Sequence, residues 1–110
     1  MPPTHDDAAL VVQLVRWGKE MHLPEAVTEV FSDKYDPEAS SADDPAVRSV
    51  LGFGETVGTL VEQGVLDRGL VLDLWWVAGL WKRVGPAALK QRHKFDEPRL
   101  YENFEALASG

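Results

Sequence analysis

The chain contains no cysteine among its 110 residues. Disulfide bonds, cysteine-ligated zinc, iron–sulfur clusters and thiol catalysis are therefore excluded. Long hydrophobic runs are also missing, because the most apolar stretch, residues 69–81, has 13 residues and contains Asp73. A helix needs about 20 apolar residues to span a bilayer, so we expect no membrane span. The amino terminus carries acidic residues where a secretory signal has basic ones, which predicts a cytoplasmic protein.

Motifs for metal, nucleotide and nucleophilic chemistry are also missing. His5, His22 and His93 have no second histidine at the spacing of a helical metal site. The acidic segment 32–44 does not follow the EF-hand spacing, because an aromatic residue and a proline stand at expected ligand positions. No phosphate-binding loop, dinucleotide fingerprint or nucleophile elbow is present. We therefore predict no catalytic, cofactor-binding or metal-binding residue and no small-molecule substrate, hence a protein that is not an enzyme.

Basic residues are scarce in the first part of the chain. The formal net charge is −7, and residues 1–44 hold ten acidic residues against three basic ones. Residues 45–110 hold eight of each sign. An acidic chain repels phosphate backbones, so general binding to nucleic acid is disfavoured.

Apolar residues make up 45% of the chain and recur at helical spacing almost throughout. This pattern predicts an all-α fold, a small bundle of four to six helices that forms one domain over residues 1–110. Thr4 and Asp7 have the spacing of a capping box, so a first helix begins there. Pro24 ends or kinks it, and a second helix follows to about Phe31. These amino-terminal helices cover residues 4–31, and an acidic loop covers residues 32–44.

Residues 45–108 are expected to form the core of the bundle. Asp44 and Pro45 have the form of a cap followed by a first-turn proline. The helix that they open carries Gly54 and Gly58 on its apolar face, where each glycine lowers helix propensity by up to ~1 kcal/mol relative to alanine. We therefore predict that another helix crosses closely at this pair, and that Gly58→Leu is strongly destabilising.

A short connection follows at Gly64, and Asp67 is placed to cap the next helix. A connection this short makes consecutive helices antiparallel neighbours, so we expect a central helical hairpin. The second helix of the hairpin should run without a break from about Arg68 to Val84. Gly85-Pro86 should then kink or end it, followed by a basic helical extension over residues 87–95 and a last helix over residues 100–107.

The second half of the chain also carries a recognisable set of residues. They are Phe53-Gly54-Glu55-Thr56-Val57-Gly58, Leu60-Val61, Gly64, Leu66-Asp67, Leu70-Val71, Trp81, Pro86, Arg92 and Pro98-Arg99-Leu100-Tyr101-Glu102-Asn103-Phe104-Glu105-Ala106-Leu107-Ala108. Over about residues 45–110 this set resembles the uncharacterised bacterial family known as domain of unknown function 4760. The resemblance implies a small helical module, sometimes membrane-tethered, with no established chemistry. Gly54 stands where the family would be expected to have a second aromatic residue beside Phe53.

The clearest charge feature is a basic strip within residues 82–95, which contain no acidic residue. The strip consists of Lys82, Arg83, Lys90, Arg92 and Lys94. One interpretation is a docking surface for an anionic partner, whether RNA, an acidic protein segment or a membrane surface. The other is that these bases complement helix dipoles and face the acidic first part of the same molecule.

The expected helix over residues 68–84 is apolar on nearly all sides, and such a helix must be buried on both faces. A symmetric dimer would cover the face that contains Leu72, Trp76 and Leu80. We therefore predict a non-catalytic helical protein-interaction module that self-associates as a homodimer through these three residues. The alternative is a nucleic-acid-binding accessory protein that uses the basic strip.

Overall fold

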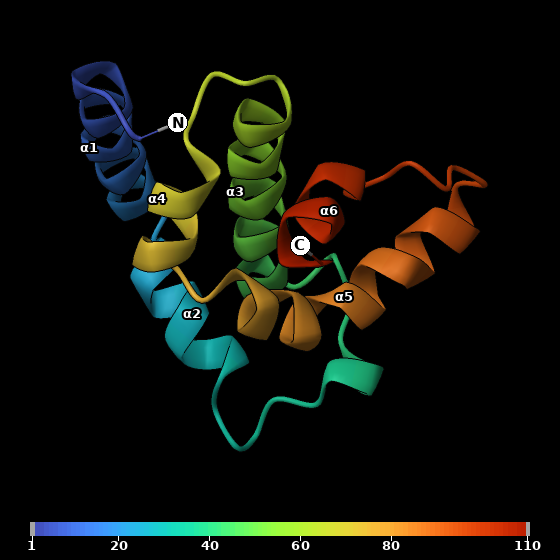
Figure 1. Ribbon diagram of the computed structural model, residues 1–110. Helices are drawn as coiled ribbons and strands as arrows, with labels where there is room; N and C mark the ends of the chain where they lie inside the picture. Colours follow the sequence, from blue (N-terminus) through green and yellow to red (C-terminus); the bar gives the residue numbers. More distant parts are fainter. Residues whose placement is uncertain (1, 110) are drawn as a thin grey trace.

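Helices account for most of the chain in the computed structural model, which describes residues 2–109 (Figure 1). This part contains no strand. The elements are α1 (His5–Glu20), α2 (Leu23–Val30), the 3-10 turn η1 (Pro37–Ala39), α3 (Pro45–Glu62), α4 (Arg68–Leu74), α5 (Val77–Lys94) and α6 (Glu102–Ser109). The predicted all-α bundle is confirmed.

Side-chain caps begin three of these helices where the sequence predicts them. The side chains of Thr4, Asp44 and Asp67 each accept a hydrogen bond from a backbone N–H two or three residues further along. At α1 the capping box is complete, because the Asp7 carboxylate also accepts the Thr4 backbone N–H at 2.7 Å. Short polar side chains therefore set the starts of α1, α3 and α4.

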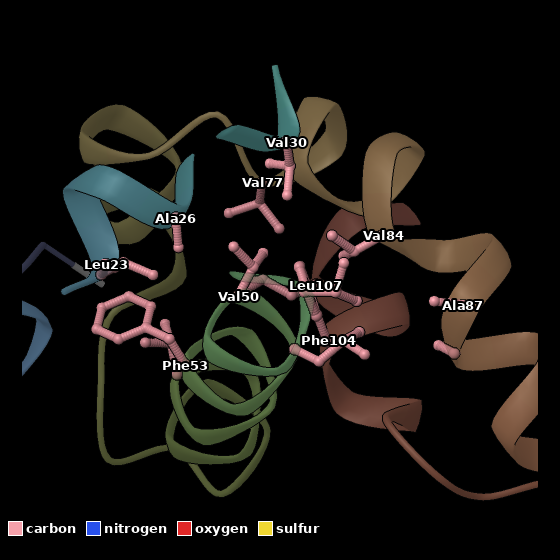
Figure 2. Close-up of a cluster of buried hydrophobic side chains, with 14 of the residues drawn as sticks. Leu23, Ala26, Val30, Val50, Phe53, Val77, Val84, Ala87, Phe104 and Leu107 are labelled. Atoms are coloured by element: carbon pink, nitrogen blue, oxygen red, sulfur yellow. The ribbon is translucent and has the colours of Figure 1, made fainter. Parts of the chain in front are cut away.

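The hydrophobic core forms around α3, which α6 and α2 contact most closely. Apolar side chains from α2, α3, α5 and α6 meet there (Figure 2), and Leu51, Val30, Val84 and Phe104 are almost completely buried. The chain turns back after α3 into α4 (Figure 1), but the closest helical neighbours of α3 come from elsewhere in the sequence. The core therefore depends mainly on contacts between distant segments.

The expected unbroken helix over residues 68–84 is wrong, because the chain leaves the helical conformation at Trp75 and Trp76. Trp75 is extended, with φ −129° and ψ 138°, and Trp76 has φ −81° and ψ 75°. In extended backbone, successive side chains point in opposite directions. Trp75 consequently packs edge-on against Phe53 in the core, while Trp76 points outward. The break thus separates two large aromatic rings that one helix would place about 100° apart.

Of the two expected outcomes at Gly85 and Pro86, an end of the helix is wrong, because α5 continues through them to Lys94. A proline in a helix interior disfavours the helix by about 3 kcal/mol. Ala87 and Ala88 directly after it are completely buried, and this part of α5 packs against α6. Burial of the segment therefore outweighs the local preference of proline.

Candidate functional site

The two glycines on the apolar face of α3 lie where α6 crosses that helix. A Cβ atom at Gly54 would overlap the ring of Phe104, and one at Gly58 would overlap the backbone carbonyl of Asn103. The predicted close crossing is confirmed, and its partner is the last helix. Gly54 stands in place of the expected second aromatic residue because the Phe104 ring occupies this space.

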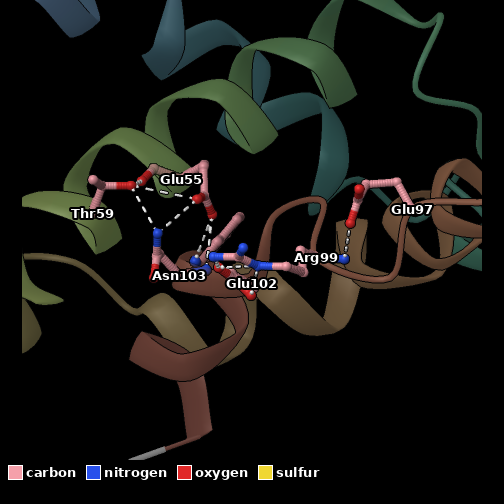
Figure 3. Close-up of polar contacts among 7 residues, drawn as sticks. Glu55, Thr59, Glu97, Arg99, Glu102 and Asn103 are labelled. Carbon is pink, nitrogen blue, oxygen red and sulfur yellow. Dashed lines mark hydrogen bonds and ion pairs between the residues drawn. The ribbon is translucent and has the colours of Figure 1, made fainter.

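Glu55, between these glycines, caps α6 from a different helix (Figure 3). Its carboxylate accepts the backbone N–H groups of Asn103 at 3.0 Å and Phe104 at 2.9 Å. It also accepts the Asn103 side-chain amide at 3.0 Å, and that amide donates to Thr59 as well. The first N–H groups of a helix have no partner within it, and they attract negative charge. Glu55 therefore fixes both the position and the start of α6.

Asp7 connects the beginnings of α1 and α4. One carboxylate oxygen completes the cap of α1, and the other accepts the backbone N–H of Asp67 at 2.9 Å. The hydrogen bond from the Thr4 backbone, together with that from Asp67, lowers the pKa of Asp7 below its ordinary value of 3.8 although burial opposes the shift. The folded chain therefore favours the charged form of this carboxyl group.

This shift predicts a pH-dependent effect of Asp7→Asn. Because the folded pKa lies below the unfolded one, the stabilisation is complete above the unfolded pKa and is lost as pH falls through the folded pKa. The variant should have a lower Tm than the parent at about pH 6, and the difference should shrink at about pH 3. Thermal unfolding followed by circular dichroism measures both, with Asp6→Asn as the control for loss of one charge. A Tm difference that is equal at both pH values would contradict the assignment.

Three of the five bases in the predicted basic strip bind the protein's own backbone. Arg83 donates to the carbonyl oxygens of Val30 at 2.6 Å, Ser32 at 3.2 Å and Tyr35 at 3.1 Å. Its guanidinium group also lies over the Tyr35 ring, and the Tyr35 hydroxyl donates back to the Arg83 carbonyl at 2.8 Å. These contacts hold the segment that follows α2 against α5.

Lys90 and Arg92 have similar contacts on different sides of α5. The ammonium group of Lys90 donates to the carbonyl oxygens of Glu38 and Ser40 beside η1. Arg92 donates to the Leu100 carbonyl at 2.7 Å and forms an ion pair with Glu105 at 3.0 Å. Lys82 and Lys94 are exposed, and so is Lys90 despite its two hydrogen bonds. The five bases therefore do not share one outward surface, and most of them secure the acidic loop and α6.

Replacing Arg83 with alanine should release the loop after α2. Hydrogen bonds to a charged group each contribute roughly 1.5–3 kcal/mol when buried, and for this half-buried side chain we expect a loss of about 1.5 kcal/mol. Urea unfolding should show this loss, and amide hydrogen exchange should accelerate in residues 31–40. Lys82→Ala, a neighbouring base on the exposed surface, should change neither. Equal exchange in the Arg83→Ala variant and the parent would refute the role of the guanidinium.

The most exposed large apolar side chain in the described chain is that of Trp76, at 70% exposure. Its ring lies over Gly79 on the first turn of α5, where a Cβ atom would overlap the indole. The ring also stacks on Phe31 at the end of α2, with centroids 5.6 Å apart and an interplanar angle of 4°. We call Trp76, Phe31 and Gly79 the tryptophan platform. It joins the end of α2 to the start of α5.

The other two predicted self-association residues lie in different surroundings. Leu72 is on α4 and is 38% exposed, and Leu74 on the same helix is 50% exposed. Leu80 on α5 packs against the core instead. Because of the break at residues 75 and 76, the predicted trio does not form one helical face. Phe31 and Gly79 were not among the predicted site residues. Their role becomes apparent only in the structure, where the exposed Trp76 ring stacks on Phe31 and lies over Gly79.

One known protein family matches nearly the whole chain. The family described as Domain of unknown function (DUF4760) matches residues 5–110. The chain belongs to this family. The match extends the sequence-based resemblance, which began at about residue 45, through α1 and α2. No curated protein and no solved structure matches the chain.

Two DUF4760 segments that carry the resemblance meet in space. Residues 53–58 supply Gly54, Glu55 and Gly58 on α3, and residues 98–108 supply Asn103 and Phe104, the groups that these residues contact or cap. The contacts between these two segments therefore account for the packing of α6 against α3.

Within residues 2–109, no helix is long and apolar enough to cross a membrane. In the same part of the chain, no three histidine, aspartate or glutamate side chains are grouped so that they could hold a metal ion.

Proposed function

We propose that this DUF4760 chain is a non-catalytic helical module that acts by protein association, and that its first partner is a second copy of itself. The observation that carries the proposal is the tryptophan platform, a large apolar ring held in one place and yet mostly exposed. Tryptophan is enriched among the few residues that dominate the energy of protein interfaces.

The way in which Trp76 is held supports this role. Gly79 on the first turn of α5 leaves room for the indole, because a Cβ atom there would overlap the ring. The parallel ring of Phe31 restricts the indole further. A side chain that is already ordered loses little rotamer freedom on binding, so more of its contact energy contributes to affinity.

A second copy fits this surface because a two-fold axis uses every anchor twice. One platform is small, but a symmetric pair would bring together two indoles with two Phe31 rings. Leu72, exposed on α4 just before the break, provides further apolar area on the segment that leads to Trp76. Leu72 and Trp76 therefore remain in the proposed interface, and Leu80 supports the start of α5 from inside.

Light scattering at increasing concentration tests the proposal. We expect the mass of the parent to approach twice the chain mass of 12.2 kDa. Trp76→Ala should weaken the dimer roughly a thousandfold, because a symmetric pair loses two anchors worth about 2 kcal/mol each.

Phe95→Ala is the matched control, because Phe95 is also an exposed aromatic residue, at 60% exposure, at the other end of α5. It should leave the dimer unchanged. A mass of one chain at all concentrations, or equal weakening by both variants, would refute the proposal.

A further inference from the structure

Helix α1 lies at one edge of the molecule (Figure 1). Among the described elements, its extended interface is with α2. Beyond that, Leu10, Val11 and Leu14 pack against the core. Trp17 stacks on Phe53 with ring centroids 5.4 Å apart, and Asp7 accepts the Asp67 N–H. Only Asp7, Leu14 and Gly18 of α1 are buried. Helix α1 therefore lies at the edge of the fold on a well-defined seat.

The connection between α1 and α2 is short and strained. It consists of Met21 and His22, and His22 has φ 59° and ψ 36°. This left-handed conformation is unfavourable for residues other than glycine, although histidine tolerates it better than most. The His22 side chain makes no capping hydrogen bond to α2. A short hinge under strain favours exchange between copies of the element that it joins, here a helix at the edge of the fold.

The geometry points to exchange of α1 between two copies of this chain, with His22 as the hinge. In the exchanged pair, α1 of one copy would occupy the seat formed by Leu23, Phe53 and the Asp67 N–H of the other. This dimer is distinct from the one proposed through the tryptophan platform, and it does not depend on it.

Exchange would keep the contacts of α1 and release the strain at the hinge. Trp17, Leu14 and Asp7 would meet the same groups on the other copy, so little contact energy is lost. Pro24 opposes fusion of α1 and α2 into one long helix, since it has no N–H to donate and would clash with the Glu20 carbonyl. The open hinge is therefore an extended one, which leads α1 away from its own chain.

The test varies residue 22 in a Trp76→Ala background, which removes the platform dimer. The chains are refolded at concentrations up to about millimolar, because a tethered helix competes at about that effective concentration, and are then examined by size-exclusion chromatography with light scattering. His22→Gly removes the strain from the closed chain. It should weaken the exchanged dimer roughly tenfold for each hinge, about a hundredfold in all. His22→Val adds strain and should shift the equilibrium in the opposite direction.

Gly64→Val is the matched control. Gly64 has φ 76° and open space where a Cβ would lie, so valine there adds backbone strain between α3 and α4, which remain in the same chain after exchange. This variant should lower stability and leave the dimer unchanged. A dimer that responds to residue 22 and not to residue 64 supports exchange. The absence of any dimer, or equal responses at both positions, overturns it, and neither result bears on the platform dimer, which this background lacks.

Discussion

Replacement of Gly58 with leucine is expected to lower the free energy of unfolding by at least about 3 kcal/mol. Even a Cβ atom at this position would overlap the carbonyl of Asn103, which is backbone and cannot rotate away. Helix α6 must then move from α3, which breaks the cap from Glu55 and opens the contact with Phe104. Urea unfolding followed by circular dichroism measures the loss.

The same helix offers an internal control for this substitution. At Gly52, no atom lies within 4 Å of the place that a Cβ would take, so Gly52→Ala should raise stability by up to about 1 kcal/mol through helix propensity. Gly58→Ala should lower stability, although the chemical change is identical. If Gly58→Ala were as stable as Gly52→Ala, the close crossing of α3 and α6 would be wrong.

Glu55→Ala is expected to cost about 3 kcal/mol, because it leaves two backbone N–H groups at the start of α6 without their partner. The Asn103 and Phe104 amides lie in the half-buried junction and both donate to this carboxylate. Glu55→Gln should have an intermediate effect, since it keeps one acceptor oxygen but removes the charge that the helix terminus attracts. Equilibrium unfolding gives the loss, and hydrogen exchange should locate it in residues 102–109.

Glu62→Ala controls for the loss of one acidic residue from α3, because Glu62 is exposed near the end of that helix. Surface substitutions of this kind usually change stability by less than about 0.5 kcal/mol. If Glu55→Ala were as mild as this control, the cap of α6 would have to come from elsewhere.

The helix starts and the crossing at α3 could be predicted because each depends on a local rule. Thr4, Asp44 and Asp67 cap the first turn of their own helices, so short sequence patterns are sufficient. Gly54 and Gly58 predicted that another helix crosses closely, because glycine lowers helix propensity and a close crossing on the apolar face compensates for that cost. The sequence did not reveal that α6 is the partner, since the contacts of that helix with Glu55 join residues 48 and 49 positions apart.

The break at Trp75 and the continuous helix through Pro86 could not be predicted for a common reason. In both places the burial of nearby side chains determines the backbone conformation, against the local conformational preference of the sequence. Residues 68–84 are apolar on nearly all sides, so helical periodicity gives no sign of where the chain turns. Pro86 is unfavourable within a helix, yet the buried Ala87 and Ala88 keep α5 continuous.

Only part of the candidate site could be predicted from the sequence. Trp76 was predicted to lie in an interface, but the prediction placed it on one helical face with Leu72 and Leu80. Its ring instead depends on Phe31, far earlier in the chain, and on the absence of a side chain at Gly79. The basic strip was visible as a run of charge. The sequence could not reveal which backbone carbonyls Arg83, Lys90 and Arg92 bind, because every residue carries a carbonyl group.

Amide hydrogen exchange of the parent at low and high concentration tests the proposed self-association most directly. Association through the tryptophan platform should slow exchange at high concentration in residues 72–80 and around Phe31, and should leave residues 89–95 unchanged. Exchange that is the same at both concentrations around Trp76, or slowed only near Phe95, would contradict it.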